Sequence, residues 1–479
     1  MENLLKQATG KLPPAGNPLV AHRYGADPYA LVFGDRVYLY MTNDALEYDE
    51  NGVIKENTYS SINKIAVISS ADLVNWTDHG EIAVAGPNGA AKWATQSWAP
   101  AAAHKVIGGK DTFFLYFANN ASGIGVLSSD SPVGPWVDPI GEALILRSTP
   151  GVEEVTWLFD PAVLVDDDGN GYIYFGGGVP EGEYAEPGTA RMMRLGDDMI
   201  SVAGTAEVIA APFMFEDAGI HKRDGLYYFT YCSNFYDGER PEGSPPAGEI
   251  AYMTGSTPMG PWTYQGTMLR NPGHFFGVSG NNHHAIFQFH GEWYIAYHAQ
   301  TLSKAQGIAN GYRSTHLNRL FHEKDGSIPH VEADYSGVQP ISRFNPYQNV
   351  QAVTIGWSAG IKTERKPGSQ EQIVTDIHNG DWIGLSGVDF GDVPAAAFLA
   401  TVISLGGGSI KLHLDHPAGP LIGVLTVPAC GEPELQSQWR TEVSGADGVH
   451  DLYLVFTGPE EAKLFELVSW QFSNRIHAS

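Results

Sequence analysis

The stretch WLFDPAVLVDDDGNGYIYFGGG, from Trp157 to Gly178, joins an apolar strand, an acidic turn and an aromatic strand. Asp160 stands at the front of the first strand, and Asp166 to Asp168 lie in the turn. The turn lacks the terminal Glu of a calcium-binding loop, so we interpret it as a hairpin turn. Asp160 is either the polar end of a strand or a functional group. Similar units elsewhere in the sequence help to distinguish these two interpretations.

The same unit recurs along the chain: a polar or small residue, an apolar strand, a turn and an aromatic strand. The five units begin at Asp27, Ala99, Asp160, Glu216 and His283. Each unit is too small to bury both faces of its strands, and radial stacking closes the sheet edges. The repeat predicts an all-β fold, a five-bladed β-propeller over residues 15–345, with a β-sandwich as the alternative.

The length and composition predict a second domain. A chain of 479 residues is longer than a domain with a single hydrophobic core usually is. Its 56 Gly and 30 Pro are typical of a fold with many short strands and turns. The blade pattern ends near residue 347. Alternating runs such as SIKLHLD and DLYLVFTG then predict a β-sandwich (jelly-roll) domain over residues 348–479.

The net charge of −26 disfavours nucleic acid and anionic membranes as partners. No run of about 18 apolar residues is present, so no transmembrane span is expected. The first residues lack a basic region followed by a long apolar region, which predicts a cytoplasmic protein, or a secreted one if a signal was removed. Cys232 and Cys430 fall in different domains, so no disulfide is expected.

The first strand of each propeller blade lines the central channel, so the leading residues of the units are expected to converge. Asp27, Asp160 and Glu216 would then meet beside His283. A single acid in such a place is often only a strand cap. Three clustered acids cost free energy through repulsion, which favours a catalytic role.

Converging carboxyl groups are suited to glycoside hydrolysis, which needs one protonated acid and one ionised base. Glu216 is flanked by Phe213, Met214 and Phe215, and this apolar setting favours its protonated form. Asp27 lies among small residues and is expected to stay ionised and hold water. Asp160 would raise the pKa of the acid by repulsion. The sequence contains no nucleophile elbow, P-loop, dinucleotide-binding or H-E-x-x-H motif.

The segments GADPYALVFGDRVYLY, SWAPA, APFMFEDAGIHKRDGLYYFTYC, GNNHHAIF and GYRSTHLNRL, together with the opening stretch, resemble glycoside hydrolase family 43. The C-terminal region resembles a family 6 carbohydrate-binding module. The resemblance covers nearly the whole chain and implies a five-bladed propeller that inverts anomeric configuration. It implies release of terminal α-L-arabinofuranose from arabinoxylan or arabinoxylan-derived oligosaccharides. A β-xylosidase and a non-catalytic sugar-binding propeller are the alternatives.

The resemblance also implies roles for individual residues. Asp27 would be the general base, Asp160 the group that orients the site and modulates pKa, and Glu216 the general acid. An inverting site is expected to hold its acid and base about 6.5–9.5 Å apart. The remaining substrate-binding residues would be Trp98 as an aromatic wall, Phe215, and a pocket floor of Asn282, His283 and Arg313.

His283 has two interpretations. The resemblance implies a position beside a calcium ion or a water on the propeller axis, and the alternative is a core histidine with satisfied hydrogen bonds. Trp98 has a similar alternative in ordinary blade packing. No cofactor is required for the expected chemistry, and the oligomeric state is left open.

The C-terminal region departs from its family in three places. Ala352 and Val353 stand where the family has an Ala-Glu pair, and Val468 replaces an Asp near the end. Both missing acids are calcium ligands in the family, so we expect no calcium there and the two valines packed together. Asp376 occupies the stretch where a sugar-stacking aromatic is expected. The domain is therefore predicted to stabilise the propeller rather than bind polysaccharide.

Overall fold

The computed structural model describes residues 5–308, 310–430 and 436–475, and most of its regular elements are strands. Internal contacts divide the chain into two units. The first consists of Tyr24–Val67 and Glu81–Gly337, and the second consists of Met1–Arg23, Ile68–Gly80 and Val338–Ser479. None of the described helices is long and apolar enough to cross a membrane.

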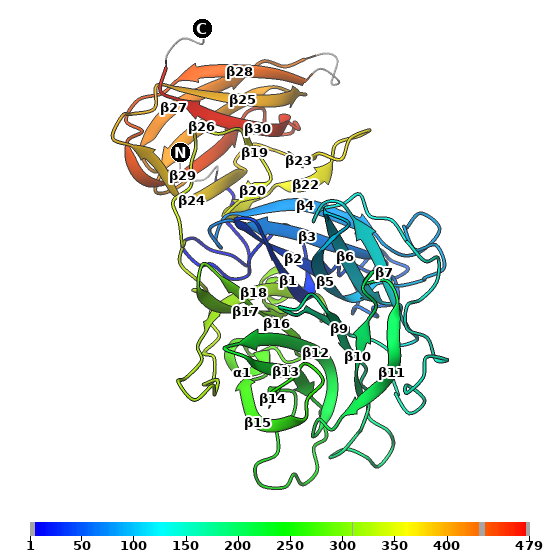
Figure 1. The fold of residues 1–479 in the computed structure, drawn as a ribbon. Coiled ribbons are helices and arrows are strands. Elements are labelled where there is room, and N and C mark those ends of the chain that lie inside the picture. The colour runs from blue at the N-terminus through cyan, green and yellow to red at the C-terminus, as the bar shows by residue number, and fades with distance from the viewer. Residues whose placement is uncertain (1–4, 309, 431–435, 476–479) are drawn as a thin grey trace. The chain divides into compact units, whose positions relative to one another are not determined.

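Five antiparallel sheets form the blades of a propeller, which confirms the predicted fold (Figure 1). The first two blades contain β1 (Ala26–Phe33), β2 (Arg36–Thr42), β3 (Lys64–Ser70) and β4 (Trp76–Ala83), then β5 (Trp98–Ile107), β6 (Lys110–Ala118) and β7 (Ile124–Ser129). The third contains β8 (Ala162–Val165), β9 (Gly171–Phe175), β10 (Ala190–Leu195) and β11 (Val202–Ile209). The last two contain β12 (Met214–Arg223), β13 (Leu226–Ser233), β14 (Ile250–Gly255) and β15 (Trp262–Leu269), then β16 (His284–Phe289), β17 (Glu292–Ala299) and β18 (Ser314–Leu320).

The first strand of each blade lies at the centre, and these strands close into a ring. β1 contacts both β5 and β16, β8 contacts β5 and β12, and β12 contacts β16. Short helices, α1 (Pro272–Phe276) and α2 (Thr301–Gln306), lie in the connections of the last two blades. The ring brings the front ends of five strands from distant parts of the sequence to one place.

Tight hairpins join the two innermost strands of most blades, and their sequences explain the geometry. Asp224 and Gly225 between β12 and β13 have φ angles of 51° and 80°, and His290 and Gly291 between β16 and β17 have 49° and 81°. Two successive residues with positive φ define the hairpin turn that matches the twist of the strands. Gly at the second position tolerates this conformation without a Cβ clash.

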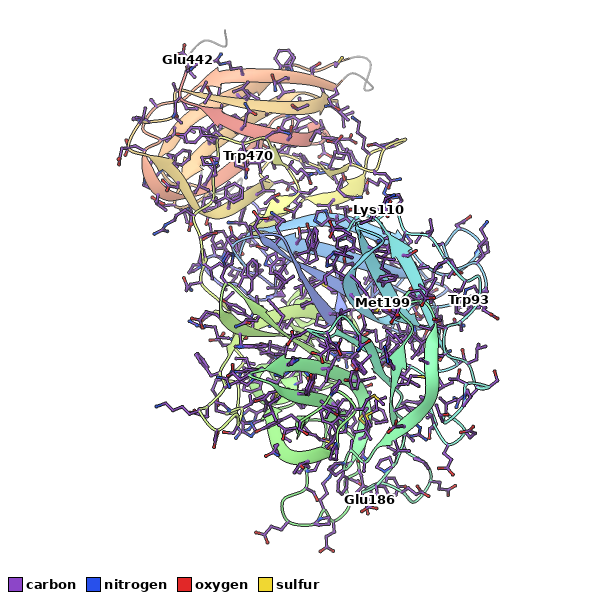
Figure 2. All side chains as sticks on the ribbon, in the orientation of Figure 1. Trp93, Lys110, Glu186, Met199, Glu442 and Trp470 are labelled. Carbon is purple, nitrogen blue, oxygen red and sulfur yellow. The ribbon has the colours of Figure 1, made fainter. Side chains whose placement is uncertain are left out.

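The second unit contains a β-sandwich, also as predicted. One sheet has the order β22-β23-β30-β25-β28, with β19 beside β30, and the other has the order β21-β24-β29-β26-β27. The strands of the first sheet are β19 (Val350–Gln351), β22 (Lys362–Arg365), β23 (Gln372–Thr375), β25 (Ala397–Ser404), β28 (Gln436–Glu442) and β30 (Phe465–Ser473). Those of the second are β21 (Trp357–Ala359), β24 (Trp382–Gly391), β26 (Gly408–Leu414), β27 (Leu421–Val427) and β29 (Gly448–Thr457). Trp470 lies between the sheets and is 1% exposed (Figure 2).

The prediction that Val353 and Val468 pack together is wrong. Val353 belongs to the main core of the sandwich, whereas Val468 packs with Ile373 and Ile403 in a separate cluster. The register explains the difference, because β30 pairs Ser469 with Thr401 but Leu467 with Val402. Val468 is the extra residue of a β-bulge, which turns its side chain away from the main core.

An N-terminal segment, residues 5–20, covers an aromatic surface of the sandwich within the second unit. The indole N–H of Trp382 donates to the Lys6 carbonyl at 2.8 Å, and that of Trp357 donates to the Ala15 carbonyl at 2.9 Å. Tyr453 stacks on Trp357 with a centroid distance of 6.2 Å, and Leu5 packs against the cluster. The three aromatic side chains are therefore 1–3% exposed.

Asp78 in β4 is a polar centre of the same unit and is fully buried. Its Oδ2 accepts from the Arg23 guanidinium at 2.9 Å and the Thr363 hydroxyl at 2.7 Å, and lies 3.0 Å from the His22 ring. Burial alone would raise the pKa of Asp78, but Arg23 and His22 hold it well below its ordinary value of 3.8. β4 also pairs with β20 (Thr354–Ile355) through Trp76 and Thr77. This carboxylate therefore joins three separate segments of the chain.

Replacing Asp78 with Ala is expected to lower the free energy of unfolding of the second unit by about 3–5 kcal/mol, because it removes a buried carboxylate that Arg23, His22 and Thr363 share. Urea unfolding followed by tryptophan fluorescence measures this, with the exposed Asp392→Ala as control. The wild-type advantage should be complete above about pH 5 and be lost progressively as the pH falls through the unfolded pKa of 3.8 toward the lower folded pKa, because the folded state holds the ionised carboxylate. Equal stability of the two variants would contradict this assignment.

Candidate active site

A cavity of about 490 Å³ lies at the front ends of the central strands of the propeller. Residues from all five blades line it, and eight of the fourteen are aromatic or acidic. The lining residues are Asp27, Tyr59, Trp98, Ala99, Asn120, Ala121, Trp157, Phe159, Asp160, Phe215, Glu216, Asn281, His283 and Arg313. The convergence expected from the repeated units is therefore present in the structure.

The leading position of the fourth unit differs by one residue from the one expected. Asp27, Ala99 and Asp160 all have a left-handed backbone, with φ angles of 47°, 38° and 49°. In the fourth blade the corresponding φ of 68° belongs to Asp217, not Glu216. The strand register supports this alignment. The register of β12 with β13 shifts after Glu216, just as the register of β1 with β2 shifts after Ala26, the residue before Asp27. Glu216 thus reaches the cavity from the position that Trp98 has in the second blade.

The cavity contains every predicted site residue except Asn282. Asn282 is fully buried, and its side-chain amide donates to the Gly248 carbonyl at 3.1 Å. Its neighbour Asn281 lines the cavity instead. In a chain that alternates its side-chain direction, adjacent asparagines face opposite sides, and the sequence alone does not say which one faces the cavity.

Asp27 is held by a buried arginine. The Nη1 of Arg313, just before β18, donates to the Asp27 Oδ1 at 2.8 Å. The Asp27 backbone N–H donates to His298 Nδ1 at 3.1 Å, and His298 Nε2 lies 3.0 Å from the Asn281 carbonyl. Burial alone would raise the pKa of Asp27, but Arg313, His283 and His298 reverse this and hold the pKa well below its ordinary range. Asp27 is therefore ionised at neutral pH.

Glu216 has the opposite environment. It is 7% exposed, and its Oε1 is buried without a hydrogen-bond partner in the part of the chain that the structure describes. Burial raises the pKa of Glu216 well above its ordinary value of 4.5, and the negative charges of Asp160 and Asp27 raise it further. A carboxyl group with these surroundings keeps its proton and can donate it.

The pKa of Asp160 is subject to opposing effects. Burial and the charge of Asp27 raise its pKa, whereas the backbone N–H of Asp217, which donates to the Asp160 Oδ2 at 2.9 Å, opposes the rise. A donor that points at a carboxylate stabilises its ionised form, and the buried Glu216 Oε1 has no such donor among the described residues. The Asp217 N–H therefore favours the ionised form of Asp160 relative to that of Glu216, and the negative charge of Asp160 raises the pKa of Glu216.

Asp217 connects the cavity to a buried polar network. It is fully buried, and its Oδ2 lies 2.5 Å from His284 Nδ1 while its Oδ1 lies 3.0 Å from His283 Nε2. The Thr230 hydroxyl lies 2.8 Å from the other nitrogen of His284. Burial lowers the pKa of both histidines to about 3, so both rings are neutral at neutral pH.

A calcium ion beside His283, which would take six to eight oxygen ligands, stays a prediction. The two carboxylate oxygens within 4 Å of His283 Nδ1 already accept hydrogen bonds from protein donors. His283 Nδ1 lies 3.4 Å from the Asp27 Oδ1, which binds Arg313, and 3.9 Å from the Asp160 Oδ2, which accepts the Asp217 N–H. Among the described residues, no group of three or more His, Cys, Asp or Glu side chains is arranged to hold a metal.

The structure adds aromatic residues that the sequence reasoning did not assign to the site. Tyr59 lies in the loop between β2 and β3, and the Arg313 guanidinium lies 4.8 Å from the centre of its ring. Trp157 makes edge contacts with Phe159 and Phe215 at 5.3 and 5.2 Å. Trp157 precedes Asp160 by three residues, so its position before a leading acid was a usable signal. Tyr59 lies outside the repeated units, so the sequence pattern gave no signal for it.

This arrangement, with an ionised acid and a protonated acid across one sugar-sized cavity of a propeller, defines a glycoside hydrolase site. Residues 15–328 match the family model described as Glycosyl hydrolases family 43, and residues 351–474 match the model described as Carbohydrate binding module (family 6). The chain belongs to glycosyl hydrolase family 43, which confirms the resemblance seen in the sequence.

Two curated relatives and one solved structure align with this protein over nearly the whole chain. An arabinoxylan arabinofuranohydrolase from Paenibacillus polymyxa is 53% identical and aligns over 97% of this chain and 75% of its own length. One from Bacillus subtilis (strain 168) is 55% identical, over 96% of this chain and 92% of its own. A crystal structure of a family 43 arabinoxylan arabinofuranohydrolase from Bacillus subtilis in complex with cellotetraose has a TM-score of 0.95 at 53% identity, covering 98% of this chain and 99% of that one.

Replacing Asp160 with Asn is expected to move the alkaline limb of the kcat/KM profile to lower pH, because it removes a negative charge that raises the pKa of Glu216. The activity needs protonated Glu216, so it falls as the pH rises through that pKa. The profile is measured on an oligosaccharide that requires leaving-group protonation. The exposed Asp130→Asn serves as control, and an unmoved limb in the Asp160 variant would show that Asp160 does not act on Glu216.

Proposed function

We propose that this family 43 hydrolase releases terminal α-L-arabinofuranose from arabinoxylan or its oligosaccharides with inversion of configuration. The observation that carries the chemistry is the contrast between two acids of one cavity. Asp27 is ion-paired and ionised, whereas Glu216 is buried, its Oε1 has no hydrogen-bond partner among the described residues, and its raised pKa favours the protonated form. The names of the relatives that align over nearly the whole chain support arabinofuranose as the sugar.

Each acid has one task in the proposed reaction. Glu216 donates its proton to the glycosidic oxygen as the bond to the anomeric carbon breaks. Asp27 takes a proton from a water molecule that attacks the anomeric carbon from the opposite face, so the configuration inverts. Asp160 keeps the pKa of Glu216 high and its Oδ2 is fixed by the backbone of Asp217.

The cavity walls support a small cyclic substrate. Trp98 and Tyr59 are linked, since the Trp98 indole N–H donates to the Tyr59 carbonyl at 3.1 Å. Phe215 and Trp157 contact each other on the side of Glu216. Aromatic faces bind the apolar faces of sugars, while the acids and Arg313 provide hydrogen-bond partners for hydroxyl groups. β-Xylose presents similar hydroxyl groups, so β-xylosidase activity is the alternative.

The two substrates are distinguished by activity on aryl α-L-arabinofuranoside and aryl β-D-xyloside. Asp27→Ala and Glu216→Ala are each expected to lower turnover of arabinoxylo-oligosaccharides by about 10²–10⁴-fold, since each removes one proton-transfer step. With an activated aryl leaving group, Glu216→Ala should lose much less than Asp27→Ala. Proton NMR of the first-formed arabinose should show the β-anomer. Near-normal oligosaccharide turnover by either variant, or first-formed α-anomer, would refute the mechanism.

We also propose that the sandwich does not bind polysaccharide through its aromatic surface. Trp357, Trp382 and Tyr453 are covered by the N-terminal segment, residues 5–20, and the indole N–H groups of the two tryptophans are already hydrogen-bonded. Asp376 is engaged with Lys362 at 3.0 Å and Lys463 at 2.8 Å, which leaves no aromatic platform at that site. The role of the sandwich is then structural.

The full-length Glu216→Gln variant, which should bind but not cleave, tests this proposal. It is expected to remain in the supernatant when mixed with insoluble arabinoxylan, apart from binding that arabinoxylo-oligosaccharides compete away from the catalytic cavity. Retention that persists when the cavity is saturated, and that Trp382→Ala abolishes, would overturn the proposal.

A further inference from the structure

A second buried carboxylate fixes the arginine that holds Asp27. Asp44 follows β2 by two residues and is 3% exposed. Its Oδ2 accepts from the Nε of Arg313 at 2.9 Å and from the Arg313 backbone N–H at 2.8 Å. Its Oδ1 accepts from Nη2 at 2.8 Å. Asp44 therefore binds one whole edge of the guanidinium and the backbone that carries it.

The remaining edge of the guanidinium determines how Arg313 meets Asp27. Asp44 binds Nε and one N–H of Nη2, and in this orientation Nη1 is the atom that donates to the Asp27 Oδ1, at 2.8 Å. His298 Nδ1 and His283 Nδ1 also approach Oδ1, at 3.1 and 3.4 Å. Among the described residues, no donor binds Asp27 Oδ2. One oxygen of the base is anchored, and Asp27 itself lines the cavity.

An arginine without this constraint binds a carboxylate differently. Arg and carboxylate groups pair preferentially in a two-bond arrangement that occupies both carboxylate oxygens. Such a pair would place a guanidinium donor on both oxygens of Asp27, so that neither oxygen would be without a protein donor. Asp44 prevents it by holding the guanidinium at a fixed angle, and the Tyr59 ring, 4.8 Å from the guanidinium carbon, covers one of its faces.

The loop that carries Asp44 is itself tied to the segment that carries Arg313. The Glu47 backbone N–H donates to the Tyr312 hydroxyl at 2.8 Å, and this hydroxyl donates to the Lys55 carbonyl at 2.9 Å. The Asn57 amide donates to the Gly311 carbonyl at 3.1 Å. These bonds join the first and last blades of the propeller, so the position of Asp44 relative to Arg313 is rigidly set.

We propose that Asp44 is a positioning residue that restricts Arg313 to a single hydrogen bond with Asp27 and so reserves Asp27 Oδ2 for the attacking water. The inference rests on the proposed role of Asp27 as general base. Asp44 does not touch substrate. It acts on the rate of water attack, through Arg313, rather than on substrate affinity.

Asp44→Asn tests the proposal, because Asn places a donor against the Arg313 donors and releases the guanidinium. With an aryl α-L-arabinofuranoside, kcat is expected to fall by about 10²-fold while KM changes less than about twofold, since misplacement of a catalytic group costs about this much. Glu47→Gln is the matched control. The Glu47 carboxylate lies in the same loop and binds the Thr58 hydroxyl, and its replacement should leave kcat within about twofold.

A double-mutant cycle with Arg313→Lys separates positioning from a general loss of structure. Lysine has no planar fork and cannot occupy both oxygens of Asp27, so Asp44→Asn should cost little further kcat in the Arg313→Lys background. Additive losses would overturn the proposal, as would normal kcat in a folded Asp44→Asn variant. If Asp44→Asn does not fold, Asp44→Glu keeps the charge and displaces Arg313; it should lower kcat about tenfold at unchanged KM, and normal kcat would equally overturn the proposal.

The outcome for Asp27 separates this inference from the proposed function. If Asp27→Ala retains turnover, the assignment of the base fails, whatever Asp44 does. If Asp27→Ala is inactive while folded Asp44→Asn turns over normally, only the inference about Asp44 fails.

Discussion

The ion pair between Arg313 and Asp27 is the interaction on which the site depends. Three carboxyl groups share one cavity, and without a cation each would raise the pKa of the others. The guanidinium is placed against one of them, so that acid alone is strongly favoured in its ionised form. Burial of Glu216 and repulsion from the other acids then raise the pKa of Glu216. One buried charge thus gives two chemically identical groups opposite protonation states.

The fold and the acids could be predicted because both follow from a repeat. Hairpins at similar spacing predict a closed ring, and a ring makes equivalent positions meet, whatever their separation in sequence. The repeat was less reliable at single-residue level. Glu216 was assigned to a position that Asp217 occupies, because two adjacent acids fit the pattern equally well and only the left-handed backbone distinguishes them. Asn281 and Asn282 posed the same ambiguity.

The parts that escaped prediction lie outside the repeat. Asp44 and Tyr59 are in a connection between strands, and their roles depend on Arg313, which lies 269 residues from Asp44. The N-terminal segment has no strand pattern, yet it covers three aromatic residues of the sandwich. The two valines were expected to touch because they replace ligands of one ion, but a bulge in β30 separates them. A pattern of residue types carries no information about such local irregularities.

The composition of the second unit has a consequence for how the chain is made. Lys6 and Trp382 are bonded to each other but lie 376 residues apart. At about 5–20 residues per second, a ribosome needs roughly 20–75 s to synthesise the chain between them. Throughout that interval the backbone carbonyl of Lys6 lacks the indole N–H that it binds in the folded chain. The propeller strands between them can pair while translation continues, so vectorial synthesis favours completion of the catalytic unit before the sandwich.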